Sequence, residues 1–145
     1  MIKILKVPRF VDRVKLFTDG GCRGNPGPGA IGVLILDADN NEMYTHSACI
    51  GQTTNNRAEY RALIKCLDAC ARFTRRRVTC YTDSQLVVNQ MTGVWRLKND
   101  ELRSPFHQAK DLERPFDEVI YQYIERTNQY IKKVDKFVNE AFEGR

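Results

Sequence analysis

The order of strand and helix patterns is the feature that most limits how this chain can fold. Three β-prone segments come first, joined by short stretches rich in turn residues, and helical patterns then alternate with two further β-prone segments. Strands joined by turns pair antiparallel, whereas strands joined through a helix run parallel to the strands they pair with. The sequence therefore predicts an α/β fold: a five-stranded mixed sheet, with an antiparallel three-strand meander and two parallel strands, flanked by helices.

The predicted elements cover most of the chain. The strands are expected at 14–18, 32–36, 43–50, 78–82 and 119–124, and the helices from after Asn56 to about 73, then at 85–91, 100–113 and 130–142. The stretch GGCRGNPGPGA, which follows the first strand, is predicted to be a loop because glycine and proline dominate it. The stretch DADNNE predicts a hairpin turn between the second and third strands.

Length, charge and cysteine content limit the class of protein. A chain of 145 residues is long enough for one domain with a sizeable core. Its five cysteines form no C-x-x-C pair, so neither a disulfide framework nor a zinc site is expected, and a reducing, cytoplasmic location fits. No apolar stretch approaches the roughly 18 residues that span a membrane, and the basic N-terminus is too interrupted by Lys6 and Pro8 for a signal peptide. The net charge of +5 permits a polyanionic partner without identifying one.

Two of the β-prone segments end in the same way. KLFTDGG and TCYTDSQ both run through an aromatic residue and a threonine into an aspartate, Asp19 and Asp83, before the strand pattern stops. A single aspartate in such a place often only opens a turn or caps the next helix. Two of them, on strands that could be neighbours in the sheet, indicate a shared role.

Two further acids lie on the inner faces of predicted helices. Glu59 stands at the head of the apolar stripe that begins with Ala62 and Leu63, which directs it toward the sheet. The alternative is a capping box, with Asn56 as the N-cap residue and Glu59 at the third helical position. Asp135 lies at the edge of the last helix's apolar stripe, and its alternative is a solvated acid in the first helical turn.

A common destination for the four acids has a chemical reason. Carboxylates buried near one another repel and are costly to desolvate, and a hard divalent cation removes both penalties. Mg²⁺ accepts ligand sets made only of oxygen, without histidine or cysteine. Two such ions can activate an attacking water and stabilise a leaving oxygen in phosphodiester cleavage. Asp19, Glu59, Asp83 and Asp135 are therefore candidate metal ligands and catalytic residues.

Four blocks of the sequence resemble the successive motifs of type 1 ribonucleases H, in the right order and spacing. They are FTDGGCRGNPGPGAIGVLI, TTNNRAEYRALIKCL, YTDSQLVVNQMTGVWRLKN and VDKFVNEAF. The resemblance implies a ribonuclease H-like fold and hydrolysis of the RNA strand of an RNA–DNA hybrid, leaving 5′-phosphate and 3′-hydroxyl ends. It implies two Mg²⁺ ions, for which Mn²⁺ is a substitute, and it assigns them to the same four acids.

The resemblance also assigns residues to the substrate. The glycine-rich loop and the TTNN segment would lie along the minor groove of the hybrid, where 2′-hydroxyls distinguish RNA from DNA. Thr54 and Asn25 would help to hold a DNA phosphate, and Trp95 either packs beside the DNA strand or belongs to the core. The complete set of substrate-binding candidates is Cys22, Arg23, Gly24, Asn25, Thr54, Asn55, Asn56, Gln85 and Trp95.

The chain departs from the better-known bacterial members in two places. The Lys- and Trp-rich basic protrusion is missing, because TGVWRLKNDELRSP passes directly from Trp95 toward the next helix. A compact subtype with weak substrate binding is therefore expected. The loop before the last acid, ERTNQYIKK, lacks the family's histidine. Arg126 is the candidate to replace it, with Glu125 and Asn128 as alternatives.

The family resemblance leaves two other functions open. The chain could be an inactive hybrid-binding module, although its complete set of acids argues against that reading. It could be another nuclease of the superfamily, such as a junction resolvase or an integrase core, although these lack the GNPGPG and TTNNRAE blocks. The expected organisation is an N-terminal extension at 1–12 and a ribonuclease H domain at 13–145, acting as a monomer on an RNA–DNA hybrid and without a membrane partner.

Overall fold

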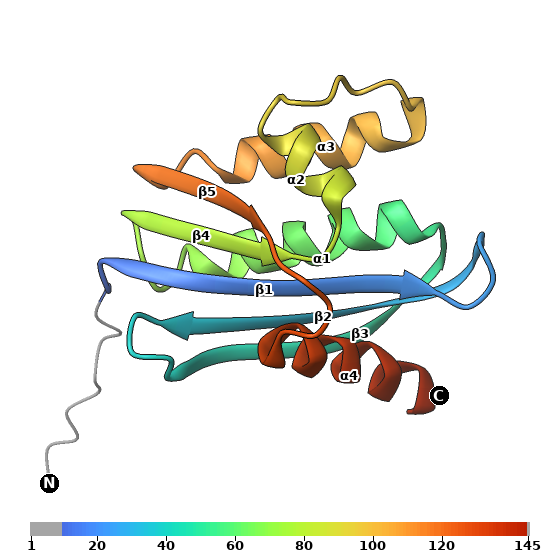
Figure 1. Cartoon of the computed structure of the whole chain (residues 1–145), viewed down its shortest axis with the longest axis horizontal. Coiled ribbons are helices and arrows are strands. Elements are labelled where there is room, and N and C mark those ends of the chain that lie inside the picture. Colours follow the sequence, from blue (N-terminus) through green and yellow to red (C-terminus); the bar gives the residue numbers. More distant parts are fainter. Residues whose placement is uncertain (1–9, 145) are drawn as a thin grey trace, which may run out of the picture.

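Five strands form one sheet in the order β3-β2-β1-β4-β5 (Figure 1). The structure is a computed structural model, which describes residues 10–144. The first three strands pair antiparallel as a meander, and β4 and β5 continue the sheet in parallel with β1. The predicted mixed sheet is confirmed. The strands are β1 (Arg13–Cys22), β2 (Gly27–Asp37), β3 (Glu42–Thr53), β4 (Arg77–Thr82) and β5 (Glu118–Tyr123).

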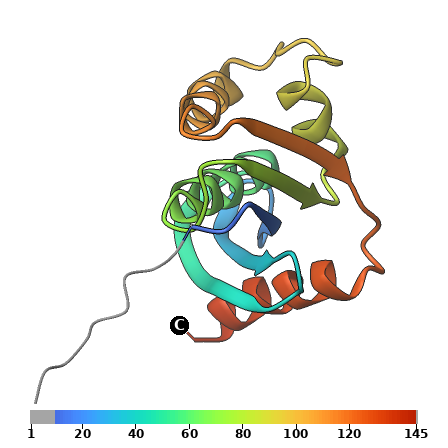
Figure 2. The same cartoon turned by 90° about the vertical axis from the view of Figure 1, so that its left-hand side faces the viewer.

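The helices cover the two faces of the sheet unequally. They are α1 (Asn55–Cys70), α2 (Gln85–Met91), the 3-10 turn η1 (Asp100–Leu102), α3 (Arg103–Leu112) and α4 (Gln129–Glu143). Helix α1 packs on one face and α4 lies across the other, over β1 to β3, while β4 and β5 extend past α4 (Figure 2). None of the helices in the described range is long and apolar enough to cross a lipid bilayer.

Alternation along the strands supplies both halves of the core. In β1, Leu16 belongs to the cluster that packs against α1, and its neighbour Phe17 belongs to the cluster that packs against α4. Helix α4 approaches β2 so closely that a Cβ atom on Gly32 would lie 2.3 Å from the Val134 carbonyl oxygen. Only glycine allows this contact. The contact places α4 directly against the strands beside the candidate site.

The glycine-rich stretch is the largest difference from the predicted elements. The sequence predicted a loop, but β1 continues to Cys22 and β2 begins at Gly27, so that only residues 23–26 turn. The two strands stay paired up to Cys22 opposite Gly29. The prediction was wrong because glycine and alanine accept extended backbone, and antiparallel pairing satisfies their N–H and C=O groups. As a result Asp19 lies inside β1 and not at its end.

Smaller differences lie at the helix ends. Helix α1 ends at Cys70, before the predicted 73, because residues 71–73 turn toward the segment that leads into β1. There the Val11 N–H donates to the Phe73 carbonyl at 2.8 Å, and the Thr74 hydroxyl donates to the Val11 carbonyl at 2.6 Å. These bonds tie residues 10–12 of the expected N-terminal extension to the domain. Residues 1–9 of that extension lie outside the described residues.

Candidate active site

Asp19 and Asp83 come together at one edge of the sheet. Strands β1 and β4 are parallel neighbours, and their pairing stops at Phe17 opposite Tyr81, two residues before each aspartate. One carboxylate oxygen from each of Asp19, Glu59 and Asp83 lies within 4.8 Å of the others. Neither aspartate has the alternative role: Asp19 is within a strand, and Ser84, not Asp83, caps α2. The parallel pairing of β1 and β4 therefore places two acids side by side just beyond the last paired residues.

Glu59 reaches this edge from the first turns of α1. The capping-box alternative is wrong, because the N-cap residue is Thr54, whose hydroxyl accepts the Arg57 N–H at 3.3 Å. The Glu59 carboxylate instead accepts the backbone N–H of Gly20 at 2.5 Å. A Cβ atom on Gly20 would lie 2.3 Å from the Ala58 carbonyl oxygen, so glycine is required where α1 meets β1. This close approach holds Glu59 against the sheet.

Asp135 completes the acidic group from the opposite face. It lies six residues after Gln129, the first residue of α4, so the first-turn alternative is wrong. Asp135 is exposed, it accepts a long 3.5 Å hydrogen bond from the Asn139 amide, and it lies outside the group of three within 4.8 Å. It is still close enough to Asp19 to help raise the pKa of that carboxyl group. The four acids thus come from β1, from the residue that follows β4, and from two helices on opposite faces of the sheet.

The electrostatics of the cluster favour a bound cation. Burial, followed by the charges of Asp83 and Asp135, raises the pKa of Asp19 to about 8. Burial, followed by the charges of Asp19 and Asp83, raises the pKa of Glu59 well above its usual range. Both carboxyl groups are therefore strained when ionised, and a divalent cation would relieve this strain. A ligand set made only of carboxylate oxygens fits a hard ion of the Mg²⁺ type.

Arg126, between β5 and α4, is the loop residue that reaches the acids. Its Nε atom lies 3.4 Å from Asp83 Oδ2, and its side chain is 86% exposed. The ion pair with Asp83 raises the pKa of Arg126 further. The Asn128 side chain instead caps α4 by accepting the N–H groups of Tyr130 and Ile131. Among the three candidates for the missing histidine, Arg126 has the position for a role at the site.

A polar network joins the hairpin turn to α1. The Asn55 side-chain oxygen accepts the Cys22 N–H at 3.0 Å, and the Asn25 side-chain oxygen accepts the Asn55 N–H at 3.1 Å. The Cys22 thiol also donates to Asn55 at 3.3 Å. These bonds join the hairpin turn to the start of α1. Both segments were predicted from the sequence to contact the substrate.

One open hollow of about 440 Å³ holds the four acids and part of the predicted substrate set. Cys22, Arg23, Asn55, Asn56 and Arg126 line it with them. Sequence reasoning missed six further lining residues: Gly20, Gly21, Ser84, Asn139, Val138 and Phe142. Three of these follow Asp135 by three, four and seven residues, the spacing of one helix face. That spacing was a signal that could have identified them.

The remaining predicted residues lie around this hollow. Trp95 lines a neighbouring hollow of about 600 Å³ that also includes Asn56, Gln90, Arg96 and Lys98. Its side chain is 45% exposed, so the core alternative for Trp95 is wrong. Asn25 and Thr54 are engaged with the start of α1, whereas Gly24 and Gln85 are exposed nearby. Since Asn56 lines both hollows, they form one continuous face of the molecule.

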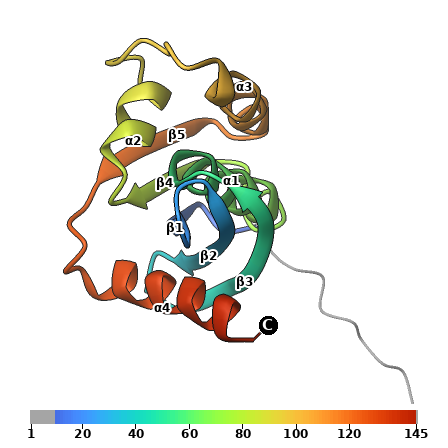
Figure 3. The same ribbon diagram turned by 90° about the vertical axis from the view of Figure 1, so that its right-hand side faces the viewer.

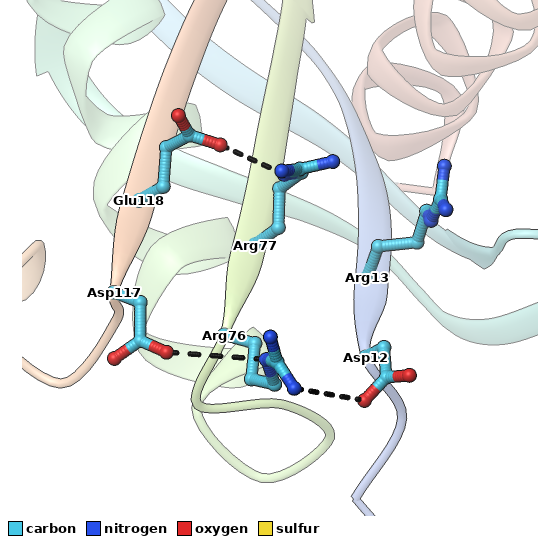
Figure 4. Close-up of a pocket in the computed structure, with 6 residues that line it drawn as sticks. All are labelled: Asp12, Arg13, Arg76, Arg77, Asp117 and Glu118. Atoms are coloured by element: carbon cyan, nitrogen blue, oxygen red, sulfur yellow. Dashed lines mark hydrogen bonds and ion pairs between the residues drawn. The ribbon is translucent and has the colours of Figure 1, made fainter.

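A third hollow, of about 330 Å³, lies at the opposite ends of the same strands. Figure 4 shows that its acids alternate with arginines. Arg76 lies 3.9 Å from Asp12 and 4.0 Å from Asp117, and Arg77 lies 2.7 Å from Glu118. Each of these surface acids lies within ion-pair distance of an arginine, whereas among the described residues only Asp83 of the acidic cluster has such a partner, Arg126. The acidic cluster, with its excess of negative charge, is therefore the candidate active site.

Known proteins match this chain in sequence and structure. The family described as RNase H matches residues 12–139. The chain is 40% identical over 121 residues to ribonuclease HI of Haemophilus ducreyi, covering 77% of this chain and 74% of the relative. It is 37% identical over 131 residues to ribonuclease HI of Halobacterium salinarum, covering 90% of this chain and 65% of that one. A bifunctional protein of Mycobacterium tuberculosis is 37% identical over 134 residues, which make up 91% of this chain but only 36% of the relative's length.

Solved structures of ribonucleases H are also similar to this chain. The crystal structure of RNase H1 from Halobacterium salinarum has a TM-score of 0.86 at 36% identity, and the match covers 92% of this chain and 99% of that one. LC11-RNase H1, solved in complex with an RNA/DNA hybrid, has a TM-score of 0.83 at 36% identity, covering 90% of this chain and 97% of that one. With the mixed sheet and the acidic edge described above, these matches place the chain in the ribonuclease H family.

Proposed function

We propose that this chain is an endoribonuclease that hydrolyses the RNA strand of RNA–DNA hybrids and leaves 5′-phosphate and 3′-hydroxyl ends. The acidic cluster at the ends of the parallel strand pairing is the observation that carries the proposal. The hybrid bound to the related LC11-RNase H1 supports the choice of substrate. Residues 13–145 would form the catalytic domain, acting as a monomer in the cytoplasm.

The acids supply the chemistry of the proposed reaction. Asp19, Glu59, Asp83 and Asp135 would hold two Mg²⁺ ions, with Mn²⁺ as a substitute. When bound, such ions activate water and stabilise the leaving oxygen of a phosphodiester. Glu59 is held by the Gly20 N–H, so this ligand is oriented before any ion binds. This preorganisation lowers the cost of assembling the site.

The asparagines at the start of α1 would distinguish RNA from DNA. The Asn55 side-chain oxygen accepts the Cys22 N–H, and this bond directs the Asn55 amide N–H groups away from Cys22. Free amide donors suit the oxygen of a ribose 2′-hydroxyl, which DNA lacks. Cys22, Arg23, Gly24, Asn25, Thr54, Asn56, Gln85 and Trp95 complete the proposed substrate-binding set.

A panel of duplexes tests the proposed function. With Mg²⁺, the full chain should cut the RNA strand of an RNA–DNA hybrid and leave RNA–RNA and DNA–DNA duplexes intact, since its contacts read the sugar and the duplex shape. Asn55→Ala should lower cutting of the hybrid without creating activity on DNA. Equal cutting of an all-DNA duplex would point to a resolvase-like or integrase-like nuclease, and binding without cutting would point to an inactive module.

Arg126→Ala tests the replacement of the family's histidine. Loss of this cation beside the acids should lower turnover by about two- to fivefold, because the Arg126 side chain is 86% exposed and an exposed charge contributes roughly 1 kcal/mol or less. A guanidinium stays charged, so neither the native protein nor Arg126→Ala should show a rate step from this residue between about pH 5 and 8.

Arg126→His is the matched comparison in a pH–rate profile. It should introduce a titration in the same window, because histidine ionises there. If Arg126→Ala instead erased a titration that the native protein shows, the assigned role of Arg126 would be wrong. If Arg126→Ala left turnover unchanged, Glu125 or Asn128 would become the candidate.

A further inference from the structure

Arg23 is an exposed cation at the rim of the acidic hollow. It is the first residue after β1, and its N–H donates to the Pro28 carbonyl at 2.9 Å, which fixes its backbone in the hairpin turn. Among the described residues, no carboxylate lies within ion-pair distance of its guanidinium. The positive charge of Arg23 is therefore available at the edge of a site that otherwise repels anions.

Phe142, in the last turn of α4, holds this guanidinium in place. The guanidinium carbon of Arg23 lies 4.4 Å from the centre of the Phe142 ring. The ring is itself 9% exposed and packs with Ala30 of β2 and Val138 of α4. Figure 3 views the molecule from the hairpin end, with α4 lying below β2 and β3. The stacking partner is thus anchored on both a strand and a helix.

Stacking leaves the hydrogen-bonding groups of Arg23 free. An aromatic ring covers the face of a guanidinium, whereas its N–H donors project from the edge and match the oxygens of a phosphate. Arg23 and Phe142 line the same hollow as Asp19 and Asp135. An arginine restrained by such a contact loses less side-chain entropy when it binds an anion.

We infer that Phe142 is a positioning residue that holds Arg23 against a phosphate of the nucleic acid, next to the phosphate bound at the acidic cluster. The inference rests on the proposed function and adds a binding contact to it. Since this contact is made in the ground state as well as in the transition state, it acts on KM more than on kcat. It also gives Phe142 a role that packing alone would not require.

Steady-state cleavage of a short RNA–DNA hybrid at several KCl concentrations, with anisotropy of the labelled hybrid, tests the contact. Arg23→Ala should raise KM by about two- to fivefold. It should also make the dependence of log KM on log salt shallower by roughly 0.7–0.9, the loss of one phosphate contact. Phe142→Leu should also raise KM, but by less than Arg23→Ala does. Phe142→Tyr keeps the aromatic ring, so its KM should equal that of the native protein.

The double variant separates positioning from packing. In the Arg23→Ala background, Phe142→Leu should cause no further rise in KM. If Phe142→Leu raised KM equally with and without Arg23, Phe142 would act through packing alone, and the inference would be overturned. Arg72→Ala is the matched control, because Arg72 stacks on Tyr44 at the far end of α1 and carries the same charge. Native-like KM and salt slope for Arg23→Ala, in a protein that cleaves the hybrid, would overturn only this inference. A native chain that neither binds nor cleaves the hybrid would overturn the proposed function and this contact with it.

Discussion

Asp83→Asn is expected to lower the rate of hybrid cleavage by about 10²–10³-fold or more while leaving the fold intact. Asp83 supplies a carboxylate oxygen within 4.8 Å of those of Asp19 and Glu59, and its side chain is only 11% exposed. Asparagine has nearly the same shape but no charge, so the site loses attraction for a divalent cation without losing volume. Single-turnover cleavage with Mg²⁺ measures the rate, and circular dichroism shows whether the fold is intact.

Asp117→Asn is the matched control for this change. Asp117 belongs to the mixed-charge hollow at the other end of the strands, where it lies 4.0 Å from Arg76 and is 77% exposed. The same chemical change at Asp117 should leave the rate of hybrid cleavage within about twofold of the native rate, since exposed ion pairs contribute little. Comparable rates for well-folded Asp83→Asn and the native protein would remove Asp83 from the catalytic set.

The parts of the fold that sequence predicted correctly are those governed by local pattern. Alternation gave the strands, helical spacing gave the apolar stripes, and the two aromatic–Thr–Asp segments predicted that β1 and β4 would place their acids together, as their parallel pairing does. These signals depend on residues close in sequence, and the burial of one face enforces them.

The errors arise where distant segments meet. The extension of β1 to Cys22 depends on pairing with β2, and no local signal distinguishes a glycine-rich strand from a glycine-rich loop. Thr54, not Asn56, caps α1, although both residue types cap helices well. The place of Phe142 beside Arg23 depends on how α4 crosses β2, which the close contact at Gly32 determines. Such contacts are tertiary and leave only weak traces in the sequence.

Without metal, the protein should lose thermal stability as the pH rises from about 4 to 8, and Asp19→Asn should lose much less. The pKa of Asp19 is about 8 in the fold against 3.8 for an unperturbed aspartate, so between these values the folded state keeps a proton that the unfolded chain has lost. Its stabilising contribution is complete below about pH 4 and is gone above about pH 8. Each pH unit in that window costs up to about 1.4 kcal/mol per group.

The difference between the two proteins isolates the cluster from other titrations. Glu59, whose pKa is also raised, acts in the same direction as Asp19, whereas burial lowers the pKa of His46 and makes its contribution rise with pH. His46 is present in both proteins, so its effect cancels when melting temperatures in a chelating buffer are subtracted at each pH.

Added Mg²⁺ then identifies the cause of the pH dependence. A cation bound among these acids replaces the proton as the neutralising charge, so the native protein should recover stability most at pH 8, where the cluster is most ionised. Asp19→Asn should recover less, because it binds the cation more weakly. Parallel melting profiles for the two proteins without metal would mean that Asp19 ionises like a surface acid, and would contradict the electrostatic strain on which the proposed metal site depends.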